Sequence, residues 1–176
     1  MPGRSTQRAG GTPLKINLRG AFLYARAVLP GMIQRHRGRI VNISSGTAVN
    51  ANPFMDALCA SKAALTHWTH CLAMGTQAQG IAVFAYAPGT VRTSGTEYRV
   101  TAPEVPQALA DRFRTRFSQG EDTPIERATQ MLLFLVSGRA DALSGRYIRA
   151  QDNEEELVRR AAEIQREDLH ILTLRT

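Results

Sequence analysis

GRIVNISSGTAVNANPFMDALCASK, residues 38–62, is the stretch that decides the fold of this chain. Residues 40–43 form a short run rich in β-branched side chains, which predicts a strand, and residues 46–53 form a turn-rich loop. Asp56 stands in the first turn of an alanine-rich helix that we expect to continue to about residue 79. Strand, loop and helix in this order are typical of an open α/β sheet.

Two serines, Ser44 and Ser45, follow the expected strand directly, and Lys62 lies on the helix that comes next. Ligands of open α/β sheets bind in the crevice outside the carboxyl ends of the strands, so two hydroxyls and an ammonium group at this edge suggest a binding site. The residues alone also allow a turn serine and a solvated lysine, since both residue types are common on protein surfaces.

This stretch resembles the catalytic segment of the short-chain dehydrogenase/reductase family, in which a serine ends the fifth strand and Tyr-x-x-x-Lys follows on the next helix. Ser45 and Lys62 match that pattern, but Leu58 stands at the position of the family's tyrosine. Asn17, within Asn-Leu-x-Gly-x-Phe, stands where the family has its active-site asparagine. The resemblance therefore implies Asn17, Ser45 and Lys62 as catalytic residues, whereas without it Asn17 would be read as a helix-start or turn residue.

A second match follows the apolar run at residues 81–87, whose continuity predicts a strand buried on both faces of a parallel sheet. The family ends its sixth strand with Pro-Gly-x-Val-x-Thr, a turn that wraps the nicotinamide carboxamide in relatives. The resemblance implies NAD or NADP as the cofactor. It assigns cofactor binding to Lys62, Pro88, Gly89, Val91 and Thr93.

The rest of the chain predicts further elements around this centre. Residues 94–120 match the substrate-covering segment of the family, and we expect them to be irregular. The other expectations are helices over 16–36 and 123–137, a last strand over 143–150, and one helix capped by Asn153 with ion pairs Glu155–Arg159 and Glu156–Arg160.

The fold expected from these patterns is α/β: a partial Rossmann-like, doubly wound fold of about three parallel strands with flanking helices. No Gly-x-x-x-Gly-x-Gly turn and no ribose-selecting residue precede residue 16, so the N-terminal dinucleotide-binding half is expected to be missing. Weak or absent dinucleotide binding should follow. We divide the chain into a disordered leader over 1–14, a truncated Rossmann domain of this family over 15–150 and a helical extension over 151–176.

Composition excludes several classes of protein. The net charge of +7 comes from scattered basic residues without interleaved aromatic residues, which argues against nucleic-acid binding. No apolar run is long enough to cross a membrane and no secretory signal is evident, so we expect a cytoplasmic protein. Cys59 and Cys71 lie about 18 Å apart along one helix and should be reduced. His67 and His70 lack a third ligand, so no metal site is expected.

Two functions remain open. The first is a truncated oxidoreductase of this family, acting on a small carbonyl or alcohol, whose proton transfer is impaired because Leu58 has no proton to exchange. Cys59 and Tyr86 are weak substitutes, since Cys59 points around the helix and Tyr86 lies on another element. The alternative is a non-catalytic subunit or interaction module that oligomerises with itself or a longer relative through the helices at 16–36 and 56–78.

Overall fold

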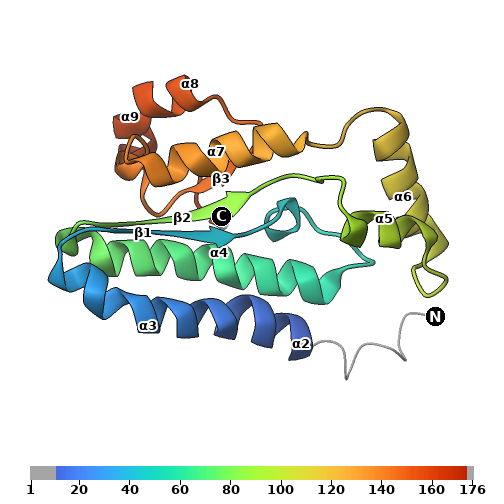
Figure 1. The fold of residues 1–176 in the computed structure, drawn as a ribbon, viewed down its shortest axis with the longest axis horizontal. Helices are drawn as coiled ribbons and strands as arrows, with labels where there is room; N and C mark the ends of the chain where they lie inside the picture. The colour runs from blue at the N-terminus through green and yellow to red at the C-terminus, as the bar shows by residue number, and fades with distance from the viewer. Residues whose placement is uncertain (1–10, 174–176) are drawn as a thin grey trace.

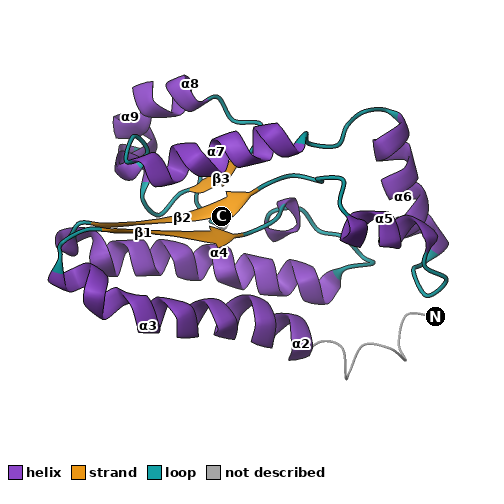
Figure 2. Ribbon diagram, in the orientation of Figure 1, coloured by secondary structure: helices purple, strands orange, loops and turns teal. Residues whose placement is uncertain are grey.

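The computed structural model describes residues 11–173, and these form an α/β unit around a parallel sheet. The sheet has three strands in the order β1-β2-β3, and both neighbouring pairs are parallel (Figure 2). The predicted fold class, a Rossmann-like arrangement of about three parallel strands with flanking helices, is therefore confirmed. The strands are β1 (Gly38–Ile43), β2 (Ile81–Ala87) and β3 (Tyr147–Arg149).

Helices cover both faces of the sheet (Figure 1). One face carries α3 (Gly20–Gln34) and α4 (Asp56–Thr76), and the other carries α7 (Ile125–Ser137) with the two C-terminal helices. None of the helices among residues 11–173 has both the length and the apolar content needed to cross a membrane. The remaining helices are α2 (Gly11–Leu14), α5 (Ser94–Thr101), α6 (Gln107–Ser118), α8 (Glu154–Arg159) and α9 (Ala161–Arg166).

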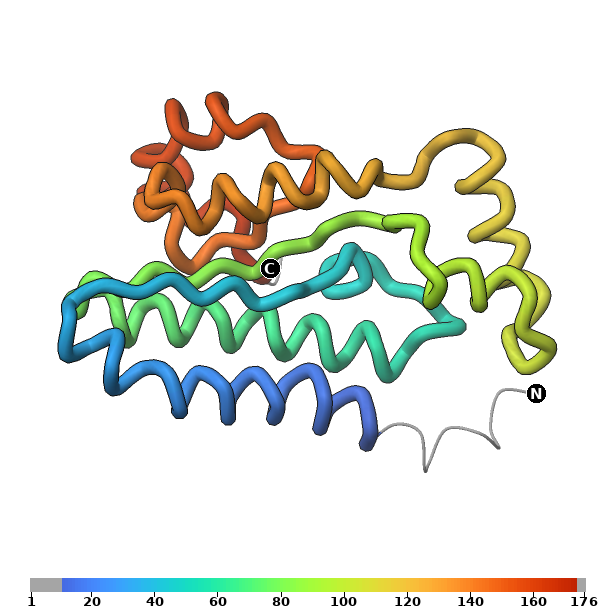
Figure 3. The backbone as a smooth tube through the Cα atoms, in the orientation of Figure 1, coloured from blue at the N-terminus to red at the C-terminus, as the bar shows by residue number. Residues whose placement is uncertain are grey.

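The path of the chain explains how α3 and α4 come to lie side by side. After α3 the chain turns into β1, and after β1 it passes through a loop into α4 (Figure 3). The strand β1 thus connects the two helices. The rings of Phe22 on α3 and Trp68 on α4 lie 6.1 Å apart, centre to centre, which joins the two helices. Both helices therefore form one layer under the sheet.

Strand β2 is the centre of the core, and all seven of its residues are buried. Phe84 and Tyr86 pack into an apolar cluster with α7, whereas Ile81 and Val83 pack toward α3 and α4. Because successive side chains of a strand point to opposite faces, one continuous apolar run serves both layers. The pattern predicted for residues 81–87 is thus confirmed.

Buried polar side chains join α4 to β1 and to the residue that follows it. Asn42 on β1 donates a 2.9 Å hydrogen bond to Thr69 on α4, and the hydroxyls of Ser44 and Thr66 lie 2.6 Å apart. All four side chains are buried. Hydrogen bonds are directional, so these two pairs fix how α4 sits along β1.

Several boundaries differ from those expected. The leader expected over 1–14 does not extend that far, because Gly11–Leu14 is helical; residues 1–10 lie outside the described residues. Residues 94–120 were expected to be irregular, but α5 and α6 occupy most of this segment. Thr93 begins α5 with a capping box, which satisfies backbone groups that the helix itself leaves unpaired.

The C-terminal helix is shorter than expected and is interrupted. Asn153 caps α8 as predicted, by accepting a hydrogen bond from the backbone of Glu156. The helix breaks at Arg160, whose guanidinium pairs with both Glu156 and Glu163 across the break. Of the two predicted ion pairs, the one between Glu156 and Arg160 is present at 3.3 Å.

Candidate active site

The candidate site lies at the edge of the sheet where the parallel strands end. The segment after β1 holds Ser44 and Ser45, and the segment after β2 holds Pro88–Thr93. Helices α5 and α6 lie beyond this edge (Figure 1). Parallel strands end on the same side of a sheet, so the two segments that were predicted to contain the site come to one edge.

Ser44 and Ser45 have different environments. Ser44 is buried and its hydroxyl pairs with Thr66. Ser45 is half-buried, and its Oγ accepts hydrogen bonds from the backbone N–H and the hydroxyl of Thr47, at 3.2 and 3.0 Å. Both bonds use Ser45 as an acceptor, so its own hydroxyl proton can be donated to a ligand oxygen.

Lys62 reaches the same edge from α4. Its Nζ donates a 2.6 Å hydrogen bond to the carbonyl oxygen of Ile43, the last residue of β1. Burial lowers the pKa of Lys62, because a charged ammonium group loses part of its hydration there. No acidic side chain within residues 11–173 forms an ion pair with it, and two of its three N–H groups remain for a ligand.

Asn17 is positioned by an irregular turn of helix. Lys15–Arg19 forms one turn of π-helix just before α3, a local widening that is frequent at functional sites. The Asn17 side-chain amide donates a 3.0 Å hydrogen bond to the hydroxyl of Ser61, which in turn donates to the Leu58 carbonyl oxygen at 2.9 Å. Asn17 is therefore tied to the first turns of α4, between Leu58 and Lys62.

Leu58 brings an aliphatic side chain to the position that the resemblance assigns to a tyrosine. It is half-buried and lies one turn before Lys62, and residues four apart share one face of a helix. An aliphatic side chain can neither donate nor accept a proton. The polar groups around position 58 are thus in place, but the side chain at that position cannot use them.

The turn at Pro88–Thr93 is held firmly by neighbouring segments. Gly89 has a φ of +79°, and a side chain there would meet the hydroxyl of Thr123 at 2.0 Å. The backbone N–H of Thr123 donates to Thr90 at 2.8 Å, and Thr96 donates to Val91 at 2.8 Å. No hydrogen bond among the described residues joins this turn to Ser45 or Lys62.

A tyrosine that the sequence did not single out also reaches the site. Tyr147 on β3 is buried, and its hydroxyl donates a 3.2 Å hydrogen bond to the Ser45 carbonyl oxygen. Burial raises the pKa of Tyr147, so it is a neutral hydrogen-bond donor. The local sequence could have indicated Tyr147 only as an aromatic residue in the last short strand. By contrast, Tyr86 donates to the Ala128 carbonyl oxygen on the α7 side, so it is no substitute for the missing phenol.

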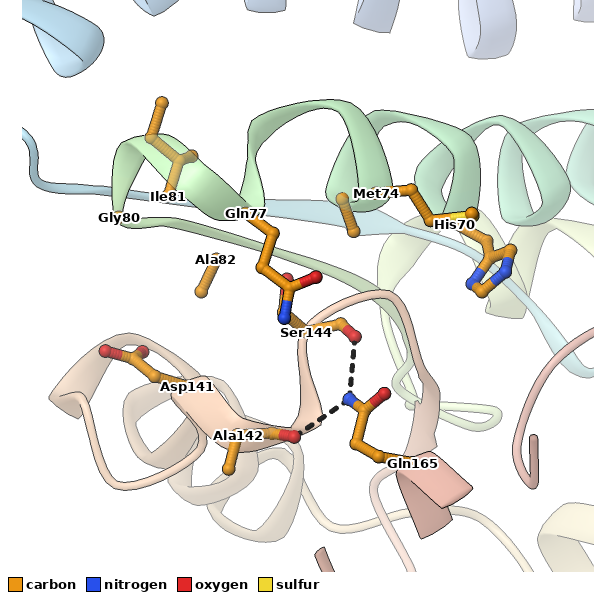
Figure 4. Close-up of a pocket in the computed structure, with 11 residues that line it drawn as sticks. His70, Met74, Gln77, Gly80, Ile81, Ala82, Asp141, Ala142, Ser144 and Gln165 are labelled. Carbon is orange, nitrogen blue, oxygen red and sulfur yellow. Dashed lines mark hydrogen bonds between the residues drawn. The ribbon is translucent and has the colours of Figure 1, made fainter. Parts of the chain in front are cut away.

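A separate hollow of about 360 Å³ lies at the opposite end of β2 (Figure 4). Gln165 projects into it and donates hydrogen bonds to the carbonyl oxygens of Ala142 and Ser144, at 2.8 and 3.1 Å. Gly80 and Ile81, at the amino end of β2, line the same hollow. It therefore lies far along the sheet from Ser45. Within residues 11–173, no group of His, Cys, Asp and Glu side chains could hold a metal ion.

Fold and site together define a Rossmann-like α/β protein with a serine and a lysine at the carboxyl edge of a parallel sheet. The family model for short chain dehydrogenases matches residues 7–104, and the chain belongs to that family. The family predicted from the sequence is therefore confirmed.

Individual relatives agree with this assignment. The chain is 30% identical over 132 residues to 2-(S)-hydroxypropyl-CoM dehydrogenase 3 of Xanthobacter autotrophicus, covering 75% of this chain and 52% of that protein. It is 31% identical over 135 residues to "Inactive 2-(S)-hydroxypropyl-CoM dehydrogenase 2" of the same organism, covering 77% and 59%. The chain thus spans roughly half the length of these relatives.

Among solved structures, the chain is similar to a gluconate 5-dehydrogenase from Burkholderia cenocepacia in complex with NADP and tartrate. The TM-score is 0.72 and the sequence identity 25%, over 83% of this chain and 56% of the other. The structural match, like the sequence matches, covers most of this chain but little more than half of the longer protein.

Proposed function

We propose that this chain supplies the nicotinamide side of an NAD(P)-dependent oxidoreductase that acts on a small carbonyl or alcohol, with proton transfer impaired by Leu58. The observation that supports this most strongly is the pairing of a donating hydroxyl on Ser45 with a partly desolvated ammonium on Lys62, at the positions where the family has its serine and lysine.

Each residue has a role that its surroundings permit. Ser45 donates its hydroxyl proton in a hydrogen bond to the substrate oxygen and polarises the carbonyl. Lys62 uses its remaining N–H groups to hold the ribose next to the nicotinamide. Asn17 holds the α4 backbone between Leu58 and Lys62 through its hydrogen bond to Ser61. The dinucleotide, when bound, supplies or accepts the hydride.

The donor set fits the nicotinamide end of the dinucleotide. Lys62 offers two N–H groups, and the turn at Pro88–Thr93 is rigid enough to present its backbone to a carboxamide. A pyrophosphate needs a different arrangement, a glycine-rich turn that opens a helix, and no such turn occurs in residues 11–173. We therefore propose weak dinucleotide binding by this chain alone.

Proton transfer is the step that Leu58 impairs. Reducing a carbonyl to an alcohol requires one hydride and one proton, and the family takes that proton from the tyrosine that this chain lacks. General acid–base catalysis contributes about 10²- to 10⁴-fold to a rate, so a loss of that order is the expected defect.

A chimaera tests this proposal. The part of 2-(S)-hydroxypropyl-CoM dehydrogenase 3 that precedes its match to this chain is fused to residue 11, and reduction of NAD or NADP is followed with 2-(S)-hydroxypropyl-CoM. Leu58→Tyr should raise the turnover about 10²-fold or more over the Leu58 chimaera. Leu58→Phe is the matched control, because it adds the ring without the hydroxyl, and it should stay at the Leu58 level. Measurable turnover that is equal in all three would show that another group transfers the proton.

A second candidate function is an interaction module, and the outer surface of the α3 and α4 layer favours it. Leu23 on α3 is 48% exposed, and two small residues of α4, Ala60 and Gly75, are exposed as well. Small residues allow helices to approach closely. Nothing lies within 4 Å of a side chain built at Gly75, so Gly75→Arg should leave the fold intact. If sedimentation shows an oligomer that Gly75→Arg disrupts and the control Ala162→Arg on α9 does not, this function is supported.

A further inference from the structure

The backbone of Ser45 leaves the sheet where the candidate site begins. The last hydrogen bond from this segment to β2 is donated by the Ser44 N–H to the Tyr86 carbonyl oxygen, at 2.6 Å. Beyond it, the Ser45 carbonyl oxygen accepts one bond from the Ala48 N–H at 3.0 Å and one from the Tyr147 hydroxyl at 3.2 Å. Among the described residues, Tyr147 is the one hydrogen-bond partner of Ser45 outside its own loop. Tyr147 therefore links the loop that carries Ser45 to strand β3.

Tyr147 is fixed on both sides of its strand. On the inner side β3 pairs in parallel with β2, and Tyr147 packs in a small buried cluster with Ala48, Ala85 and Ala87. On the outer side its N–H donates to the His170 carbonyl oxygen at 2.7 Å. The His170 ring binds as well, because its Nδ1 lies 3.2 Å from the Tyr147 carbonyl oxygen and that oxygen can only accept. His170 thus holds Tyr147 by one backbone bond and one side-chain bond.

The segment after α9, residues 167–173, is termed here the closing segment, and it follows an uncommon path to reach β3. Asp168 has a φ of +49° and His170 a φ of +59°, in the left-handed region that residues other than glycine seldom adopt. Such strain persists only where the surroundings over-determine the conformation. Here Leu169 packs against the apolar cluster of β2 and α7, and the Asp168 carboxylate pairs with the buried Arg146 at 3.3 Å. The fold thus accepts backbone strain to place His170 against β3.

We infer that the closing segment is a positioning element of the candidate active site, and that His170 acts on Ser45 through Tyr147. The contacts are continuous: His170 holds the backbone of Tyr147, and the Tyr147 hydroxyl holds the backbone of Ser45. The inference rests on the function proposed above, in which the Ser45 hydroxyl donates to the substrate oxygen. A purely structural role would lower the stability of the whole fold, whereas a positioning role alters the loop of Ser45 first.

Hydrogen exchange of the full chain, followed residue by residue by NMR, tests the inference. His170→Gly removes the ring and suits the positive φ, so it relieves the backbone strain. The amide of Ala48, which donates to the Ser45 carbonyl oxygen, should exchange about two- to tenfold faster, because one hydrogen bond in the series is lost. His170→Asn should restore the slow exchange, because asparagine also tolerates the left-handed region and its side-chain amide can donate to the Tyr147 carbonyl oxygen.

Tyr147→Phe breaks the series at its second contact and should speed exchange at Ala48 by a similar factor. In that background His170→Gly should have no further effect, since both substitutions act through one series of contacts. The amide of Thr96 is the internal control, because it closes a turn at the start of α5 and donates to Thr93 alone. Its exchange should be the same in every variant. Unchanged exchange at Ala48, equal acceleration at Ala48 and Thr96, or additive effects of the two substitutions would overturn the inference.

A second readout separates this inference from the proposed function. In the Leu58→Tyr chimaera, His170→Gly should lower kcat about two- to tenfold and leave the KM for the dinucleotide unchanged. The reason is that neither Lys62 nor the turn at Pro88–Thr93 has a hydrogen bond to His170 or Tyr147 among the described residues. A raised KM with an unchanged kcat would overturn the inference. A chimaera without any turnover would count against the proposed function alone, and the exchange measurement would still decide the inference.

Discussion

The hydroxyl pair between Ser44 and Thr66 allows a quantitative test of how α4 is held against β1. Ser44 is 4% exposed and Thr66 3%, and their oxygens lie 2.6 Å apart. Thr66→Val keeps the shape of the side chain but removes its hydroxyl, which leaves the Ser44 hydroxyl buried without a partner. An unsatisfied buried polar group costs about 1–3 kcal/mol. Ser44→Ala should cost a similar amount because it strands Thr66.

The double variant Ser44→Ala/Thr66→Val should be less destabilised than the sum of the two single variants, since no unpaired hydroxyl remains. We expect a coupling free energy of about 1–2 kcal/mol between the two positions. Urea unfolding followed by the fluorescence of Trp68, the one tryptophan of the chain, measures all four free energies of unfolding. Strictly additive effects, or single variants as stable as the unmodified chain, would refute the argument that this pair fixes α4 against β1.

Three further predictions follow from single contacts. Gly89→Ala should destabilise the chain more than Gly120→Ala by about 1–3 kcal/mol, because both glycines have positive φ but only a side chain at Gly89 meets Thr123. Thermal unfolding compares the two variants, and equal losses of stability would show that φ alone sets the destabilisation. Tyr147→Phe should cost about 0.5–1.5 kcal/mol through the lost bond to Ser45, while the exposed Tyr98→Phe should cost less. The pKa of Lys62 lies below its usual value of 10.5 in the folded chain, so the unfolded chain binds more protons between the two values, and the stability contributed by this residue should rise with pH in that window. The free energy of unfolding of the chain minus that of Lys62→Met should therefore increase with pH across that range, and a constant difference would contradict the argument.

Local patterns in the sequence were sufficient for the elements that form the centre of the fold. The β-branched run of β1, the unbroken apolar run of β2 and the alanine-rich helix α4 each follow from the side chains of one short segment. Once these elements were identified, Ser45 and Lys62 could be predicted to lie at one edge of the sheet. Helices α5 and α6 were missed because Pro103, Pro106 and the arginine cluster of α6 favoured an irregular segment. The apolar residues of α6 do stand at helical spacing, at Leu109, Phe113 and Phe117, but the helix buries little beyond Leu109 and Ala110.

Contacts between distant segments could not be predicted in this way. The hydrogen bond from Tyr147 to Ser45 joins residues that are 102 positions apart, and nothing in the local sequence of either residue indicates it. The same applies to Asn17, which was predicted at the site but whose partner, Ser61, lies 44 positions away on α4. Pairing of polar groups inside a core depends on how the elements pack, and it becomes visible only in three dimensions.

The contacts around position 58 determine whether exchanging its side chain is informative. The Leu58 backbone is held by α4 and by the bond from Ser61 to its carbonyl oxygen, and Ser61 is held in turn by Asn17. None of these bonds involves the Leu58 side chain, so a tyrosine introduced there would start from the same Cα position, one turn from Lys62. Leu58 is also only half-buried, which leaves room for a larger ring at the edge of the site. If the Leu58→Tyr chimaera shows no turnover at all, the defect therefore lies elsewhere in the site, and not in a misplaced ring.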